Sequence, residues 1–206
     1  LRAQNGAVSN GKPQTWRFRG SATCLLYTDK AGEFDVNFKV IPLRPNRKFN
    51  YQVVVKLANN TLVEKFNVDK LNYTRKLKSN GKKLYILEIN RSSQTIDVSA
   101  DCAGFGFLVQ NRVALFRGGM KKMYFYVQPG VKEFKIEVLG TGAGEWVTAQ
   151  LCNAAGTVVD KCTKNAGAVI LKGVRADASK GEVWQLKLLG KEDHYLRFGA
   201  PLIPIV

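Results

Sequence analysis

The sequence predicts an all-β protein built from two tandem antiparallel β-sandwich domains that are related by an internal repeat. Three observations support this fold class. Apolar and polar residues alternate with a period of two along many short segments, as in strands with one buried face. Clusters of Gly, Pro, Asn and Ser separate these segments. Blocks of similar sequence also recur at an offset near 100 residues.

Strands are predicted where the alternation is sustained. The predicted strands cover residues 34–40, 51–57, 84–89, 123–127, 134–138 and 183–188. Turn-forming residues such as Ser79-Asn80-Gly81 and Gln128-Pro129-Gly130 lie between them. No segment carries a sustained apolar stripe with a period of 3.6 residues, so we expect little helix.

The repeat consists of three matched blocks in the same order. These blocks pair residues 27–34 with 126–134, 55–65 with 149–161, and 81–89 with 181–188. We therefore predict a polar N-terminal tail over residues 1–15, a first sandwich over 16–117 and a second over 118–206. Each would be an antiparallel unit of seven to nine strands.

Length and composition agree with two folded domains. The chain has 206 residues, 45% of them hydrophobic and 23% charged, which is typical of globular proteins. No apolar run is long enough to span a bilayer, and no secretory leader opens the sequence. Because the chain begins at Leu1 and not at Met, we expect a processed mature form or a fragment.

The four cysteines favour disulfides over a metal site. No Cys-x-x-Cys pair occurs, and His194 is the one histidine, so we expect no zinc, no other metal and no cofactor. One bridge per half is predicted, Cys24 with Cys102 and Cys152 with Cys162. The alternative is four buried free thiols.

The net charge of +16 is concentrated in the first half of the chain. Residues 1–117 contain 20 Lys and Arg against 8 Asp and Glu, whereas residues 118–206 contain 12 against 8. Such a field attracts polyanions, although charged loops also serve solubility alone. The basic candidates for ligand binding are Arg44, Arg47, Lys48, Arg75, Lys76, Lys78, Lys82 and Lys83.

Strand alternation also sorts the tryptophans. Trp16 and Trp184 share their faces with apolar residues and are predicted to lie in the cores. Trp146 shares its face with Thr148 and Gln150, so it is the candidate platform for stacking on a sugar ring. The alternative is a tryptophan that packs over a sheet edge.

Catalytic signatures are missing from the sequence, and we expect no enzyme. No paired carboxylate arrangement, nucleophile elbow, phosphate-binding loop or calcium loop is recognisable. His194 follows Asp193 in a polar connection and is predicted to be an exposed turn residue. No nucleic-acid-binding signature accompanies the basic residues, so nucleic acid is not an expected partner.

The second half of the chain resembles a known module. Residues 123–134, 151–159, 181–186 and 199–204 are similar to the jelly-roll accessory domain that is appended to large bacterial polysaccharide-degrading enzymes. The similarity covers residues 120–206 well and 20–117 loosely. It implies jelly-roll-like sandwiches, an extracellular or cell-surface location, a bacterial source and proximity to carbohydrate.

Two functions follow as hypotheses. The first is a non-catalytic extracellular structural protein that self-associates into a filament or surface assembly, with a second copy of itself as partner. The alternative is a carbohydrate-binding accessory module for acidic or sulfated polysaccharide, with the basic residues and Trp146 as its contacts. A lyase acting on a polyanionic polymer is a third, less favoured hypothesis.

Overall fold

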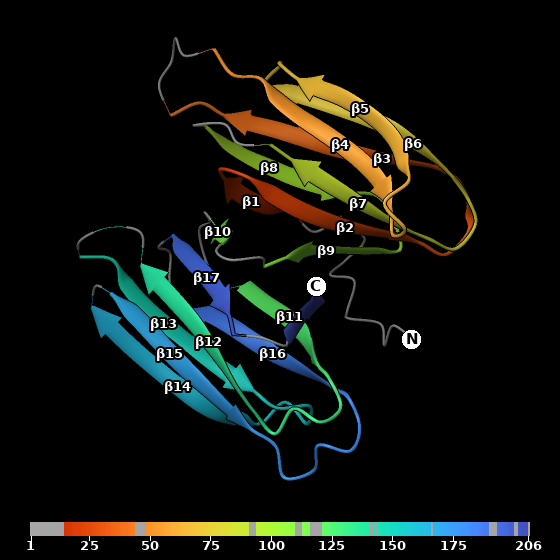
Figure 1. The fold of residues 1–206 in the computed structure, drawn as a ribbon. Helices are drawn as coiled ribbons and strands as arrows, with labels where there is room; N and C mark the ends of the chain where they lie inside the picture. The colour runs from red at the N-terminus through yellow and green to blue at the C-terminus, as the bar shows by residue number, and fades with distance from the viewer. Residues whose placement is uncertain are drawn as a thin grey trace. The chain divides into compact units, whose positions relative to one another are not determined.

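The fold was obtained as a computed structural model, which describes residues 15–43, 48–90, 94–109, 113–115, 121–140, 142, 144–165, 167–189, 193–199 and 202–205. The regular secondary structure of these residues consists entirely of β-strands (Figure 1). The predicted all-β sandwich class is therefore confirmed. Accordingly, the described part of the chain contains no helix that is long and apolar enough to cross a membrane.

The chain forms two compact units that divide between Phe107 and Leu108. The predicted boundary lay ten residues further on, between Arg117 and Gly118. The difference arises because β10 (Val113–Leu115) pairs with β17 (His194–Phe198) and so belongs to the second unit. Of the predicted N-terminal tail, only Thr15 lies within the described residues.

The described residues of the first unit form nine strands. They are β1 (Trp16–Arg19), β2 (Ala22–Thr28), β3 (Ala31–Ile41), β4 (Tyr51–Leu57), β5 (Leu62–Val68), β6 (Asn72–Asn80), β7 (Lys83–Ile89), β8 (Thr95–Ala100) and β9 (Gly104–Leu108). One sheet has the order β6-β3-β8-β1 and the other the order β5-β4-β7-β2-β9. The pairs β1·β8, β2·β7, β3·β6 and β4·β5 are nested like a long hairpin rolled into two layers, which is the jelly-roll topology.

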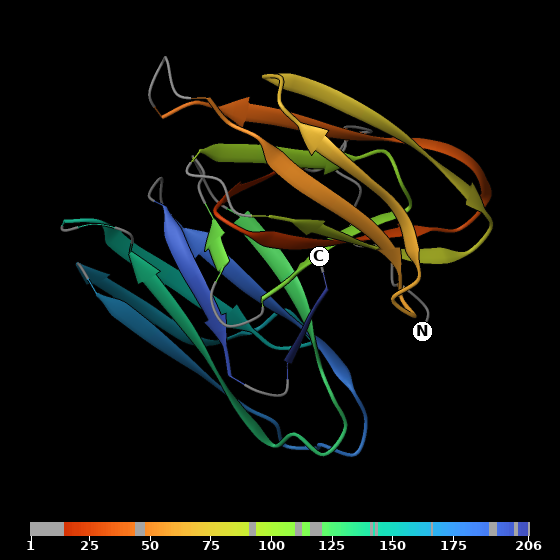
Figure 2. The same cartoon turned by 45° about the horizontal axis from the view of Figure 1, so that its top comes forward.

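The described residues of the second unit form the other nine strands. Besides β10 and β17, these are β11 (Lys121–Val127), β12 (Glu133–Gly140), β13 (Trp146–Cys152), β14 (Val158–Asn165), β15 (Ala168–Val174), β16 (Glu182–Leu189) and β18 (Leu202–Ile205). Its sheets have the orders β15-β12-β17-β10 and β14-β13-β16-β11-β18. Figures 1 and 2 show each unit as two layers of strands.

The two strand orders correspond strand for strand, with β10 in the place of β1 and so on to β18 in the place of β9. The irregular features correspond as well. A register shift follows Val55 in β4 and Leu151 in β13. The turns that follow these two strands have a residue with positive φ at the same point, Asn60 at 66° and Gly156 at 81°. Whether one sequence unit was copied to give both stays a prediction.

Each core is built from the inward positions of two facing sheets. In β3, Phe34, Val36, Phe38 and Val40 are all buried, while the residues between them are exposed or half-buried. This is the pattern expected of a sheet with one wet face. Trp16 and Trp184 are 1% and 2% exposed, as their strand faces predicted. The outward faces therefore carry the side chains that are available for binding.

Candidate functional site

The outward face of the five-stranded sheet in the second unit presents an exposed tryptophan. Val147, Ala149 and Leu151 of β13 are fully buried, so the alternate residues point outward. These are Trp146, Thr148 and Gln150. Trp146 is 51% exposed. The indole is therefore a surface group, with a hydroxyl and an amide following it along the strand.

Three lysines lie in one row across the same face. Gln150 is paired in register with Lys161 of β14 on one side and with Lys187 of β16 on the other. Lys187 is paired in turn with Lys122 of β11. We call Lys161, Lys187 and Lys122 the lysine row. Adjacent strands are about 4.8 Å apart, so Lys187 and Lys122 are neighbours and Lys161 lies about 10 Å away.

Among the described residues of these four strands, no carboxylate lies on the same face as the lysine row. The other outward side chains there include Thr163, Asn165, Val183, Gln185, Leu189, Tyr124 and Tyr126. None of the salt bridges formed by the described residues includes a lysine of the row. The row is thus an uncompensated positive strip within reach of the exposed indole.

Sequence reasoning missed the lysine row. All basic candidates were chosen from the first half of the chain, where most of the lysines and arginines lie. The three lysines come from three strands that are far apart in sequence. A usable signal existed, because Lys122, Lys161 and Lys187 each occupy a polar position of an alternating strand. Their alignment into one row required the register of the sheet.

Arg75, predicted as a ligand-binding residue, points inward. It lies in β6 opposite Val36, on the side of the buried strand positions. Its guanidinium forms an ion pair with Glu64 of β5 and lies 5.6 Å from the centre of the Phe66 ring. The hydrogen bond to Glu64 raises the pKa of Arg75. This arginine closes the side of the sandwich between two edge strands instead of facing a ligand.

The other predicted basic residues do not converge on one site. Lys76 and Lys78 are exposed on β6, and both lie near Glu33, at 3.5 and 3.4 Å. Lys48 and Lys82 are exposed, and Lys83 is half-buried. Lys78 and Lys83 line a shallow, largely apolar hollow of about 320 Å³. Arg44 and Arg47 lie outside the described residues.

The predicted disulfides are wrong, because all four cysteines are free. Cys162 is paired in register with Ala149, whereas Cys152 is paired with Val158. The two thiols are therefore three positions apart along the strands, about 10 Å, beyond the roughly 7 Å limit between Cα atoms for a bridge. The extracellular or cell-surface location stays a prediction.

The cysteines of the first unit are separated in a similar way. Cys24 is fully buried in β2, and burial raises the pKa of its thiol. Cys102 follows β8, and its thiol donates a hydrogen bond of 3.1 Å to the carbonyl of Gly104. A Cβ atom added to Gly104 would lie 3.4 Å from the Cβ of Tyr27, so this segment runs beside Tyr27. Tyr27 is three residues beyond Cys24, again about 10 Å. Burial raises the pKa of Cys102 to about 11, so neither thiol is a ready nucleophile.

His194 is not the exposed turn residue that the sequence predicted. It begins β17 and is fully buried. The polar pair Asp193-His194 suggested a loop, but His194, Leu196 and Phe198 alternate toward the interior. Its imidazole is therefore a core group of the second unit and is not available to a ligand from solution.

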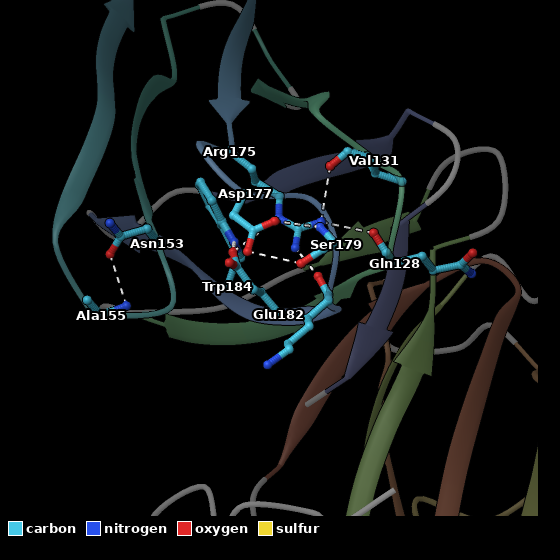
Figure 3. A network of polar contacts seen from close by, with 10 residues as sticks. Gln128, Val131, Asn153, Ala155, Arg175, Asp177, Ser179, Glu182 and Trp184 are labelled. Atoms are coloured by element: carbon cyan, nitrogen blue, oxygen red, sulfur yellow. Dashed lines mark hydrogen bonds and ion pairs between the residues drawn. The ribbon is translucent and has the colours of Figure 1, made fainter.

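A buried arginine holds one end of the second unit together (Figure 3). The side chain of Arg175 is 1% exposed. Its guanidinium donates to the carbonyls of Gln128 and Val131, at 3.0 and 3.1 Å, and to the carbonyl of Lys180. Nε lies 3.2 Å from the Glu182 carboxylate. These partners fix two loops, so Arg175 is structural and does not face solvent.

The described residues contain no group of three or more His, Cys, Asp or Glu that could hold a metal ion. No protein-family model matches the chain, and no curated protein matches it in sequence. The resemblance to accessory domains of polysaccharide-degrading enzymes therefore stays a prediction. The case for a function depends on the surface chemistry of the units themselves.

Proposed function

We propose that the chain is a non-catalytic module that binds an acidic or sulfated polysaccharide through the second unit. The observation that carries this proposal is the carboxylate-free outward face with the lysine row and the exposed Trp146. An ammonium row attracts repeated anionic groups, and an indole face packs against the apolar face of a sugar ring.

The dimensions of the face suit a polymer. Trp146 and Gln150 are four residues apart along β13, which is about 13 Å, and the lysine row extends about 14 Å across the strands. A sheet face of this size is open at its ends, so a chain of sugars can pass over it. Thr148 lies between the indole and the lysine row, and Gln150 lies within the row between Lys161 and Lys187. Both supply hydrogen-bonding groups for sugar hydroxyls.

The proposal is tested by measuring binding of heparin, polygalacturonate, alginate and carrageenan with the whole chain in calorimetry and affinity electrophoresis. We expect retardation by at least one of these polymers, weakened by salt because exposed charges are screened. Replacing the lysine row with glutamine should weaken binding about tenfold or more, and Trp146→Ala should do the same.

The matched control is Lys76→Gln with Lys78→Gln and Lys83→Gln, which removes three lysines from the first unit. The control variant should retain binding within about twofold, because two of these lysines already lie near Glu33. Equal losses in both triple variants, or no retardation by any polymer at low salt, would contradict the proposal. Equal retardation by single-stranded DNA would show a general polyanion surface in place of a glycan site.

Self-association into a filament or surface assembly stays a prediction. The edge strands β5 and β14 carry inward-pointing carboxylates, Glu64 and Asp160. Asp160 accepts a hydrogen bond of 2.7 Å from the backbone N–H of Lys172 in β15. Charged groups at sheet edges disfavour the addition of a further strand, so these edges support the glycan-binding proposal over assembly through strand pairing. Light scattering at several concentrations tests assembly directly.

A further inference from the structure

The first unit has a polar hollow on the outward face of its four-stranded sheet. The hollow has a volume of about 320 Å³, within the range of small-molecule sites. Six of the side chains that line it come from polar positions of β3, β6 and β8. They are Asn37, Lys39, Asn72, Thr74, Asp97 and Ser99. We call this hollow the trough.

The register of the sheet arranges these side chains in two adjacent rows. Asn37 is paired with Thr74 on one side and with Ser99 on the other. The second row has Lys39 in the centre, flanked in the same way by Asn72 and Asp97. Neighbouring groups within a row are therefore about 5 Å apart. This spacing lets two groups contact one sugar ring at different hydroxyls.

The hydrogen-bonding groups of the trough are partly preorganised. The Thr74 hydroxyl donates a hydrogen bond of 2.8 Å to the Asn37 amide oxygen, which leaves the amide N–H groups of Asn37 to donate elsewhere. The Asp97 carboxylate accepts two hydrogen bonds from Arg17, at 2.5 and 2.8 Å, and its side chain is only 12% exposed. A fixed carboxylate beside amide donors is suited to vicinal hydroxyls, which donate and accept at once.

The trough carries less charge than the lysine row. Its lining contains one cation, Lys39, and one carboxylate, Asp97, which is already paired with Arg17, so the trough has a single net positive charge. One charge attracts an anionic polymer less than the three charges of the lysine row do, so hydrogen bonding dominates the chemistry of the trough. The lining contains hydroxyl, amide, ammonium and carboxylate groups side by side, so it presents both donors and acceptors.

The fold itself does not require the amide and hydroxyl groups of these rows. At the corresponding place on β15 and β12, the second unit has Ile170 opposite Glu137 and Ala168 opposite Leu139. Glu137 is paired on its other side with Arg197, and the two form an ion pair. The same topology therefore forms with apolar residues and an ion pair, so the amide and hydroxyl lining of the trough is a property of the first unit.

From these observations we propose that the trough binds a neutral, hydroxyl-rich sugar unit. The chain would then hold two saccharide sites of different chemistry, an ionic one on the second unit and a hydrogen-bonding one on the first. The trough is shallow and wet, so the dissociation constant is on the order of 1 mM. This inference is independent of the lysine row and goes beyond the proposed function.

The experiment is heteronuclear NMR on the whole chain with neutral oligosaccharides of the cello, xylo, manno and malto series. It is carried out in about 0.5 M NaCl, where exposed charges are strongly screened. At least one series should shift the amide signals of Asn37, Thr74 and Asp97, with an affinity that salt does not change. Absence of such shifts with all four series would overturn the proposal.

Two variants test whether the side chains of the trough bind the neutral oligosaccharide. Asn37→Asp retains the shape and the acceptor for Thr74 but removes the amide donors, and Asn37→Ala removes both. Each should weaken binding about tenfold. Replacing the lysine row with glutamine should leave this binding unchanged while it weakens binding of acidic polymers about tenfold or more. The reverse result would place the neutral sugar on the second unit and overturn the inference.

Discussion

The two units have the same strand order, but different side chains occupy the equivalent positions of their strands. Phe34 packs against Tyr85 with ring centroids 5.7 Å apart, and Phe134 packs against Trp184 at 5.0 Å. Opposite Phe34 lies Leu77, whereas Gly173 lies opposite Phe134. A Cβ atom at Gly173 would come within 2.2 Å of the Phe134 ring. The larger tryptophan is thus accommodated by removing a side chain across the sheet.

Polar pairs of the first unit also have apolar counterparts in the second. Arg75 lies opposite Val36 in β3, and the corresponding position opposite Ile136 is Leu171. Arg17 is paired with Asp97, and the corresponding pair is Ala114 with Tyr195. The comparison shows that the jelly roll depends on alternation and turns, while the identity of each polar pair is open to change.

The two units also differ in how many of their basic side chains form ion pairs. The first unit has more lysines and arginines, but Arg17, Lys56, Arg75, Lys76 and Lys78 all form ion pairs. The second unit has fewer, yet no ion pair among the described residues includes a lysine of its lysine row. Net charge per domain is therefore a poor guide to where an anion would bind, because compensation by neighbours decides the local field.

The largest expected difference concerns the two inward-pointing arginines. Arg175→Met should lower the free energy of unfolding by about 3–5 kcal/mol, because Glu182 and several carbonyls lose a buried partner. Leucine is the residue at the equivalent position of the second unit, Leu171. Arg75→Leu should lower the free energy of unfolding by only about 1 kcal/mol, since the Arg75 side chain is 42% exposed. Urea unfolding monitored by tryptophan fluorescence measures both. Similar losses would show that the two arginines are equally structural.

The next effect is a fall in the free energy of unfolding at alkaline pH, caused by a residue of the first unit. Burial raises the folded-state pKa of Cys24 above its ordinary value of 9.0. The unfolded chain then loses its proton first, so stability is complete below pH 9 and falls as the pH rises further. The loss is about 1.4 kcal/mol per pH unit for this thiol. Urea unfolding between pH 8 and pH 10 should show a smaller slope in Cys24→Ala.

The same variant provides a control on the state of the cysteines. Thiol titration in denaturant should return four reactive groups for the native sequence and three for Cys24→Ala. A count of zero in the native sequence would mean that the disulfides predicted from sequence do form. An unchanged alkaline slope in Cys24→Ala would assign the weakening to another group.

A smaller effect is expected for the ion pair that orders the trough. Arg17→Ala and Asp97→Ala, combined in a double-mutant cycle, should give a coupling energy of about 1 kcal/mol, because the Arg17 side chain is 40% exposed. The corresponding pair in the second unit is Ala114 with Tyr195, so the fold tolerates the loss. A coupling several times larger would make this pair a folding requirement of the first unit.

The smallest effect concerns the equivalent turns. Asn60 has a φ of 66° and Gly156 a φ of 81°. Exchanging them, as Asn60→Gly and Gly156→Asn, should change stability by about 0.5 kcal/mol or less, since both residues tolerate this conformation. Gly156→Ala should cost more, about 1 kcal/mol, although no atom lies within 4 Å of the added Cβ. Equal effects of Asn and Ala at this position would contradict the equivalence of the turns.

The sequence by itself determined the fold class and the faces of the strands. Alternation with a period of two is a local property, so it predicted that Trp16 and Trp184 are buried and that Trp146 is exposed. The positions of Asn60 and Gly156 in turns follow in the same way from local chemistry. The matched blocks at an offset near 100 residues predicted an internal repeat, and that repeat stays a prediction.

Only the tertiary structure decided which side chains meet. Partners such as Arg75 with Glu64 and Arg175 with Glu182 come from different strands, and their meeting depends on register and on the packing of one sheet against the other. The lysine row, the trough, the free thiols and the burial of His194 depend on the same long-range geometry. A shift of one residue in a strand would reverse every one of its faces, so local patterns leave these contacts undetermined.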